Sequence, residues 1–351
     1  DENVNFIAEE YDKAIAELPA EISDFTKWAG RITKGAAMAA KARLMLYAAS
    51  PLYNGCDLYK GQMKNLYGDF LFPQSPDPQK WEKAAKAAKD VIDMNIYELY
   101  KDQTEADPLL RAIKSYQGVL FEEWNKETIW GAWGRNPTNT GLGAIGFYLY
   151  SRCMPPRVCE LGVGGFCPSL KLVDTYPMAK SGRYPVTGYD KQSGYTNTGF
   201  TENFKQPGAS FAPGFKAHNS CVGRDARFYA SVFPNGFYWI NQYKGIKQVT
   251  FFTGGSSSYL ESGDCVKVGY LWRRPLDPAL NTESGSWGTV FWPYFRLAEI
   301  YLDYAEACNE KPERNETEAL KYINLVRERS GLNALETAYP EVKGNKDLLR
   351  M

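Results

Sequence analysis

Residues 293–332 read PYFRLAEIYLDYAEACNEKPERNETEALKYINLVRERSGL, and this stretch decides the fold. Its first half predicts a helix over residues 295–309, because apolar side chains recur at the i, i+3, i+4, i+7, i+8 and i+11 spacing of one helical face. The members of that face are Leu297, Ile300, Tyr301, Tyr304, Ala305 and Cys308. The polar segment 310–314 then interrupts the pattern and predicts a short turn.

The second half of the stretch predicts another helix with a start and a stop signal. Asn315 is a good N-terminal cap, and Glu318 stands three residues later, where the acid of a capping box belongs. Gly331 followed by Leu332 indicates a C-terminal stop with a hydrophobic contact. The apolar side of this helix consists of Ala319, Ile323 and Val326. A pair of helices cannot bury its apolar stripes alone, so the sequence predicts further helical hairpins that stack on this one.

Similar periodic segments occur upstream. Helices are expected over residues 3–18, 35–49 and 109–120, and from Asp77-Pro78 to Ile92. Between 128 and 293, glycine, proline, asparagine and aromatic residues dominate and helical periodicity is brief. The fold class we expect is mainly α: a tetratricopeptide-like helical-hairpin scaffold with a loop-rich lobe that has minor β structure. Its segments would be a scaffold (1–127), a loop-rich ligand-binding lobe with short strands (128–292) and a returning hairpin (293–351), all in one compact domain.

Several blocks of this sequence resemble the SusD/RagB family, the surface glycan- and nutrient-binding lipoproteins of Bacteroidetes outer membranes. The most specific are RLAEIYLDYAEA at 296–307 and ALKYINLVRERSGL at 319–332. Weaker similarity extends over residues 30–55, 127–133, 162–178, 223–232 and 266–275.

The resemblance implies a function without bond cleavage. Such a protein would bind an oligosaccharide or another nutrient at the cell surface and deliver it to a SusC-like TonB-dependent transporter in the outer membrane. Family members carry a signal peptide and a lipid-modified cysteine far upstream, together with additional helices. We therefore expect this chain to be a fragment that lacks its N-terminal part and the end of its C-terminal segment.

The charge balance gives no reason to expect nucleic acid as a partner. Lys and Arg together number 41, as do Asp and Glu, so no electrostatic attraction to nucleic acid is expected. No run of about 18 apolar residues exists that could span a bilayer. A neutral surface suits uncharged glycans.

Common catalytic centres also find little support. His218 is the single histidine and has no nucleophile-elbow glycines around it, so we expect a structural role for it. We expect neither a metal nor a cofactor: zinc ligands are absent, and the glycines at 162–165 lack the third glycine of a dinucleotide loop. Among the seven cysteines, Cys153, Cys159 and Cys167 are close enough in sequence for one disulfide, although buried free thiols are favoured.

Aromatic residues in loops are the candidate ligand contacts, because a pyranose ring stacks its C–H face on Trp or Tyr while polar neighbours bind its hydroxyls. The candidates are Trp133 with Arg135 and Asn136, Tyr148, Trp239 with Asn241, and Trp287. We assign Trp81, Trp130, Trp272 and Trp292 to the core.

Two alternatives to glycan capture stay open. A glycoside hydrolase would need two opposed carboxylates, one with a raised pKa. Glu299 and Asp303 lie one helical turn apart but are expected to face water. The other alternative is a helical-repeat scaffold that binds only proteins, which burial of the candidate tryptophans would favour.

Overall fold

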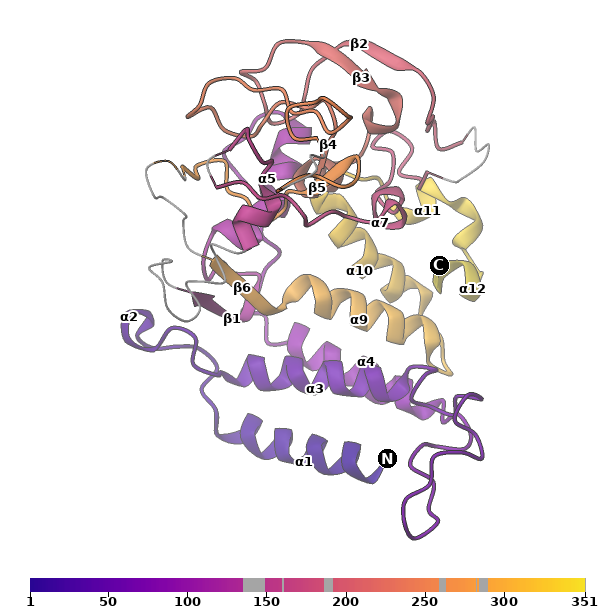
Figure 1. Ribbon diagram of the computed structural model, residues 1–351. Helices are drawn as coiled ribbons and strands as arrows, with labels where there is room; N and C mark the ends of the chain where they lie inside the picture. The colour runs from indigo at the N-terminus through magenta and orange to yellow at the C-terminus, as the bar shows by residue number, and fades with distance from the viewer. Residues whose placement is uncertain are drawn as a thin grey trace.

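A stack of helices forms one half of the molecule (Figure 1). The computed structural model describes residues 1–134, 149–159, 161–185, 192–258, 263–281, 283 and 290–350. The stacked helices are α1 (Glu2–Glu17), α3 (Lys34–Ala49), α4 (Gln79–Ile92), α9 (Leu297–Glu310) and α10 (Glu316–Arg329). Each packs on the next: α1 on α3, α3 on α4, α4 on α9 and α9 on α10. The predicted mainly α scaffold is therefore confirmed.

Small side chains allow the close approach of α3 and α4. Ala39 and Ala42 of α3 and Ala84 and Ala88 of α4 are all buried in one apolar cluster. That cluster continues through Ile300, Tyr304, Ala305 and Cys308 of α9, whereas Leu297 belongs to a smaller cluster with Leu99. Alanine costs no side-chain entropy and leaves room for the neighbouring backbone, so an alanine-rich face favours tight helix contact.

The predicted ends of α10 are confirmed in detail. The Asn315 side chain accepts a hydrogen bond from the Glu318 backbone N–H at 3.1 Å. Gly331 has φ +75°, and the Leu332 N–H donates to the Arg327 carbonyl at 3.1 Å, the arrangement of a Schellman stop. The capping box is only half formed, because the Asn315 N–H donates to the Cys308 carbonyl instead of the Glu318 carboxylate.

The other half is a loop-rich lobe with short two-stranded sheets (Figure 1). Its strands are β2 (Phe200–Phe204), β3 (Phe215–His218), β4 (Val232–Pro234) and β5 (Tyr270–Trp272). Its helices include α5 (Pro108–Phe121), α7 (Leu170–Asp174) and α8 (Ala226–Ser231). The segment 223–232, which resembles a turn and strand, is mostly α8, since the Asp225 carboxylate caps a helix by accepting from the Arg227 and Phe228 N–H groups.

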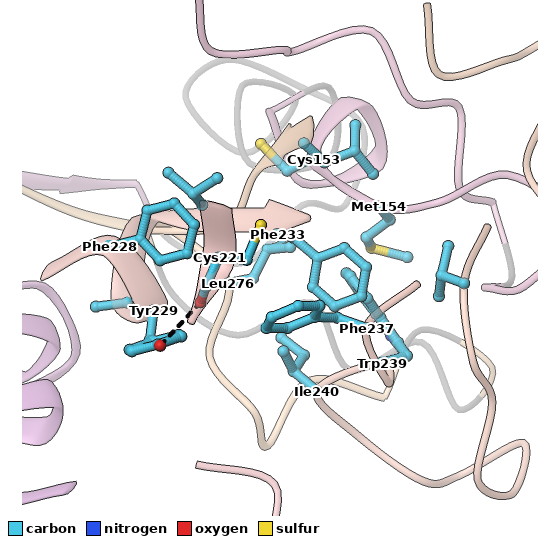
Figure 2. Packing of buried hydrophobic residues seen from close by; sticks show 14 of the residues in the cluster. Cys153, Met154, Cys221, Phe228, Tyr229, Phe233, Phe237, Trp239, Ile240 and Leu276 are labelled. Carbon is cyan, nitrogen blue, oxygen red and sulfur yellow. Dashed lines mark hydrogen bonds between the residues drawn. The ribbon is translucent and has the colours of Figure 1, made fainter. Parts of the chain in front are cut away.

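Buried aromatic rings form the core of this lobe (Figure 2). Phe228, Phe233, Leu271 and Leu276 have almost no exposed surface. Their cluster includes Ala112 and Ile113 of α5. Helix α5 therefore joins the scaffold segment to the lobe.

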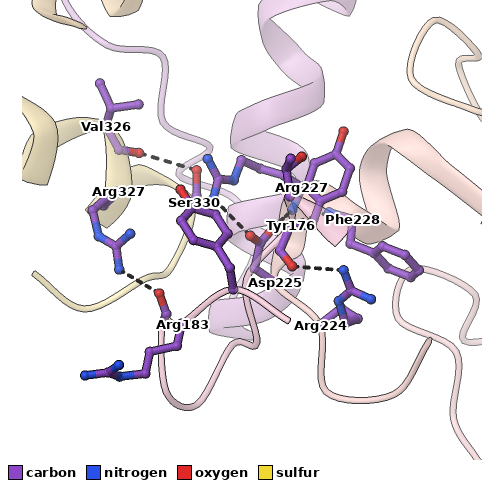
Figure 3. Close-up of polar contacts among 12 residues, drawn as sticks. Tyr176, Arg183, Arg224, Asp225, Arg227, Phe228, Val326, Arg327 and Ser330 are labelled. Carbon is purple, nitrogen blue, oxygen red and sulfur yellow. Dashed lines mark hydrogen bonds and ion pairs between the residues drawn. The ribbon is translucent and has the colours of Figure 1, made fainter. Parts of the chain in front are cut away.

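Arginine side chains form hydrogen bonds between separate segments of the lobe and between the lobe and α10 (Figure 3). Arg224 donates to the carbonyls of Ser220 and Tyr176 at 2.8 and 2.9 Å. Arg327 of α10 donates to the Gly182 carbonyl at 3.2 Å. Among the described residues, the hydrogen bonds of these two cations go to backbone carbonyls, and neither cation is in an ion pair.

The remaining elements complete the chain: α2 (Phe25–Trp28), β1 (Thr128–Gly134), β6 (Val290–Arg296), α11 (Leu335–Ala338) and α12 (Lys346–Arg350). Phe295 and Arg296 belong to β6, so α9 begins two residues later than predicted. Across the described ranges, no helix has the length and apolar character needed to cross a bilayer. The division into segments 1–127, 128–292 and 293–351 stays a proposal.

Candidate ligand-binding surface

Strands β1 and β6 form an antiparallel ladder at the edge where the helical stack meets the lobe (Figure 1). Gly134 is paired with Val290, and Trp133 with Phe291. The candidate residues Arg135 and Asn136 follow β1 directly, and Trp287 precedes β6. Both stretches therefore attach to the same end of the ladder, at Gly134 and Val290, which we call the ladder tip.

The opposite end of the ladder is held by a buried carboxylate. Glu127 accepts from Arg296 Nη1 at 2.9 Å and from the Tyr100 N–H at 3.0 Å, and it also pairs with Arg329. Burial alone would raise the pKa of Glu127, but the Arg329 and Arg296 charges outweigh it and hold that pKa below its ordinary value. The ion cluster of Glu127, Arg296 and Arg329 therefore connects this end of the ladder, which we call the ladder base, to α10.

Two aromatic rings stand outward on β6. Trp292 and Tyr294 are 42% and 46% exposed, whereas Phe291 and Phe295 are buried. This alternation follows from the two-residue period of a strand. The assignment of Trp292 to the core was therefore wrong, because strand alternation turns its ring to solvent.

Trp130 of β1 backs this outward face. Its ring stacks on Tyr294 at a centroid distance of 5.0 Å. Its Nε1–H donates to the Gly30 carbonyl at 3.0 Å, which ties the ladder to the segment after α2. The ladder thus presents a fixed aromatic face next to its tip.

Most of the predicted contact residues cannot be placed. Arg135, Asn136, Tyr148 and Trp287 lie outside the described residues. Trp133 has its backbone in β1, and its side chain is likewise outside the description. These residues remain predictions.

Trp239 and Asn241 do not belong to this surface. Trp239 is 3% exposed and packs edge-on against Phe233 at 5.1 Å, inside the lobe core (Figure 2). The Asn241 side chain donates to the Leu280 carbonyl at 3.0 Å. A ring buried on both faces offers no platform to a sugar, so Trp239 fits the core and not the expected loop contact.

Glu299 and Asp303 also differ from expectation. Glu299 pairs with Arg43 of α3, and Asp303 Oδ2 is buried with no hydrogen-bond partner among the described residues. Burial, with smaller contributions from Glu299 and Glu306, raises the pKa of Asp303 to about 7. The two acids therefore lie at the contact of α9 with α3 and do not both face water. Their position accounts for the raised pKa without any catalytic role.

The remaining reactive groups have structural surroundings. His218 Nδ1 lies 2.8 Å from Ser220 Oγ, and the ring caps the short helix Asn219–Cys221. The seven cysteines all lie in described segments and are free thiols. Cys153 and Cys159 are buried, which raises the pKa of both thiols. Cys167, the third member of that sequence cluster, is only half-buried.

Comparisons with known proteins agree on one family. A family model described as the SusD family matches residues 126–351. The solved structure of BT4246 aligns with a TM-score of 0.73 at 28% identity, over 99% of this chain and 62% of that chain. A SusD-like protein, BF3747 from Bacteroides fragilis, aligns with a TM-score of 0.65 at 24% identity, over 99% of this chain and 56% of that one. A SusD-like carbohydrate-binding protein, BF0978 from the same species, shares the fold with a TM-score of 0.60 at 17% identity, over 99% and 54%.

No curated protein sequence matches this chain. The chain spans about three fifths of the length of BT4246 and less of the two other relatives.

Proposed function

The chain belongs to the SusD family, and on this basis we propose that it binds an uncharged oligosaccharide at the ladder tip and does not cleave it. The register of β1 and β6 carries the proposal. It attaches the stretch with Arg135 and Asn136 and the stretch with Trp287 to one place, beside the exposed rings of Trp292 and Tyr294.

The chemistry of this surface suits a sugar chain. Flat aromatic rings bind the apolar faces of successive pyranoses, and arginine and asparagine side chains bind their hydroxyls. The Glu127 ion cluster and the Trp130–Tyr294 stack hold the rings in place before a ligand arrives. Preorganisation of this kind lowers the entropic cost of binding.

We propose further that the whole protein is held at the outer-membrane surface by a lipid anchor upstream of residue 1. There it would hand its ligand to a SusC-like TonB-dependent transporter, as the family resemblance implies. Recovery of the transporter with the tagged full-length protein from solubilised outer membranes tests this partnership.

Calorimetric titration with a panel of neutral oligosaccharides tests the binding site. The panel includes xylogluco-oligosaccharides, because one solved structure with this fold was determined with xylogluco-oligosaccharide. Trp287→Ala and Trp292→Ala are each expected to weaken binding about fivefold or more, since the loss of one ring from a stacked contact costs roughly 1–3 kcal/mol when the stacked group is a nucleic-acid base. Phe6→Ala is the matched control, because Phe6 on α1 is an exposed ring away from the ladder.

Unchanged affinity in both tryptophan variants, with binding intact in the wild type, would place the ligand elsewhere. The appearance of reducing ends from any polysaccharide would contradict the absence of cleavage and favour a glycoside hydrolase. A protein that binds no glycan in the panel and captures only protein partners would favour the scaffold alternative, for which the burial of Trp239 is one supporting observation.

A further inference from the structure

A pocket lies beside α2, at the base of the ladder. It encloses about 160 Å³, and its aromatic lining consists of Phe25, Tyr97 and Trp124. Thr128 and Ile129 at the start of β1 line it too. At roughly 3.4 Å per strand residue, Thr128 is about 20 Å from the ladder tip at Gly134. The Trp124 wall of the pocket reaches further along the ladder, since its ring contacts Phe291, the neighbour of Val290. We call this cavity the α2 pocket.

The aromatic walls of the α2 pocket are fixed in position. The Trp124 ring makes edge contacts with Phe25 at 5.6 Å and with Phe291 at 5.2 Å. Tyr97 packs directly over Gly35, where an added Cβ would lie 1.9 Å from the tyrosine oxygen. Phe25 is 49% exposed, so one wall remains open to a ligand.

Charged groups of both signs stand on the rim. The Arg31 guanidinium lies 3.7 Å above the Trp28 ring, which holds it in place. Glu21 lines the same pocket. Within the described part of the chain, neither Glu21 nor Arg31 is in an ion pair, so a ligand finds both an acceptor and donors here. At the floor, the buried Thr128 hydroxyl also lacks a hydrogen-bond partner among the described groups.

We propose that the α2 pocket binds a single neutral sugar ring and is a second carbohydrate site, separate from the ladder tip. Its volume is below the roughly 300–1,000 Å³ of pockets for drug-sized ligands, which suits a single ring. An open aromatic wall matches the C–H face of a pyranose, and opposite charges on the rim match hydroxyls that both donate and accept. The choice of a sugar as the ligand rests on the proposed function. The shape and lining of the pocket come from the contacts described above and do not depend on it.

Ligand-observed saturation-transfer NMR with D-glucose, D-galactose, D-mannose and D-xylose tests the pocket. Wild type and Phe6→Ala are expected to give the same dissociation constant for the preferred sugar. Phe25→Ala is expected to raise that constant at least about tenfold, and Glu21→Gln several-fold. Thermal melts accompany each variant, and if Phe25→Ala does not fold, Glu21→Gln decides.

The two proposals fail in different ways. If Phe25→Ala and Glu21→Gln leave monosaccharide binding unchanged, or if wild type gives no signal with any of the four sugars, the α2 pocket is not a sugar site. Calorimetric titration of the same proteins with oligosaccharides tests the ladder tip independently of the α2 pocket. Loss of oligosaccharide binding in Trp287→Ala then keeps the ladder tip as a site even where the α2 pocket proposal has failed.

Discussion

Glu127 is a fully buried carboxylate whose negative charge offsets two arginines. Glu127→Gln leaves Arg296 and Arg329 without that charge in a buried setting. We expect a loss of about 3–5 kcal/mol in the free energy of unfolding, the usual cost of removing one partner of a buried ion pair. Urea unfolding measures it.

An exposed acid provides the comparison. Glu98 lies 3.9 Å from Lys126 on the surface, so Glu98→Gln should change stability by less than about 1 kcal/mol. Equal effects of the two substitutions would contradict a special role for Glu127. Because the pKa of Glu127 is below its ordinary value, its contribution is present at neutral pH and is lost as the pH falls through the folded-state pKa.

Asp303 has the opposite effect from Glu127 on the pH dependence of stability. Its pKa of about 7 in the folded protein is higher than in the unfolded chain, so the folded state binds the proton more tightly. Stability should therefore decrease as the pH rises from about 4 to about 7 and stay low above that. Asp303→Asn should raise the free energy of unfolding at pH 8, by up to roughly 4 kcal/mol, and have little effect near pH 4.

Unfolding curves of wild type and Asp303→Asn across this pH range test the sign. A variant that is less stable than wild type at pH 8 would show that the charged carboxylate is favourable where it lies. The acids and the base that face Asp303 are Glu299, Glu306 and Arg43, so their substitution would shift the midpoint of the pH effect.

The exposure of individual side chains was the feature least predictable from the sequence. Trp292 and Trp239 occur in similar aromatic, glycine-containing surroundings, yet one ring is exposed and the other is buried. The difference depends on strand register and on contacts with residues far along the chain. Local sequence does not contain that information.

Among the elements, the stop of α10 depends on a left-handed residue. Gly331 has φ +75°, so Gly331→Ala should cost about 1 kcal/mol in the free energy of unfolding. Gly269 is the control, because its φ is not positive and a Cβ there meets nothing within 4 Å. Gly269→Ala should change stability by less than about 0.5 kcal/mol, and a comparable loss at both positions would argue against a conformational cause.

Helices were predictable as elements because their signals are local. The apolar period of α9, the Asn315 cap and the Gly331 stop all lie within a few residues of the structure they specify. Strands were less predictable than helices from the local sequence. Phe295 and Arg296 continue the helical pattern of α9 in sequence, but pairing with β1 makes them strand residues.

For the whole molecule, formal neutrality leads to a prediction about salt. Positive and negative side chains are equal in number, and the proposed ligand carries no charge. The affinity for a neutral oligosaccharide should change less than about twofold between about 50 mM and about 500 mM salt, because screening has no ligand charge to act on. Calorimetry at both salt concentrations measures this, and a steep fall in affinity would indicate an acidic glycan or peptide.

The overall architecture was partly accessible from sequence. The helical scaffold follows from repeated apolar faces, and the loop-rich lobe follows from the glycine, proline, asparagine and aromatic residues between 128 and 293. The arrangement inside that lobe was not predictable, because its short strands pair across long sequence separations and its core is assembled from scattered aromatic residues.

The pairing of Gly134 with Val290 has a practical consequence for protein engineering. It brings one end of each of two segments to the same place, because residues 135–148 leave β1 at Gly134 and residues 284–289 enter β6 at Val290. Residues 135–148 and 284–289 can therefore be replaced together by the corresponding segments of a relative. Such chimaeras would acquire a new sugar preference and keep the melting temperature of the parent.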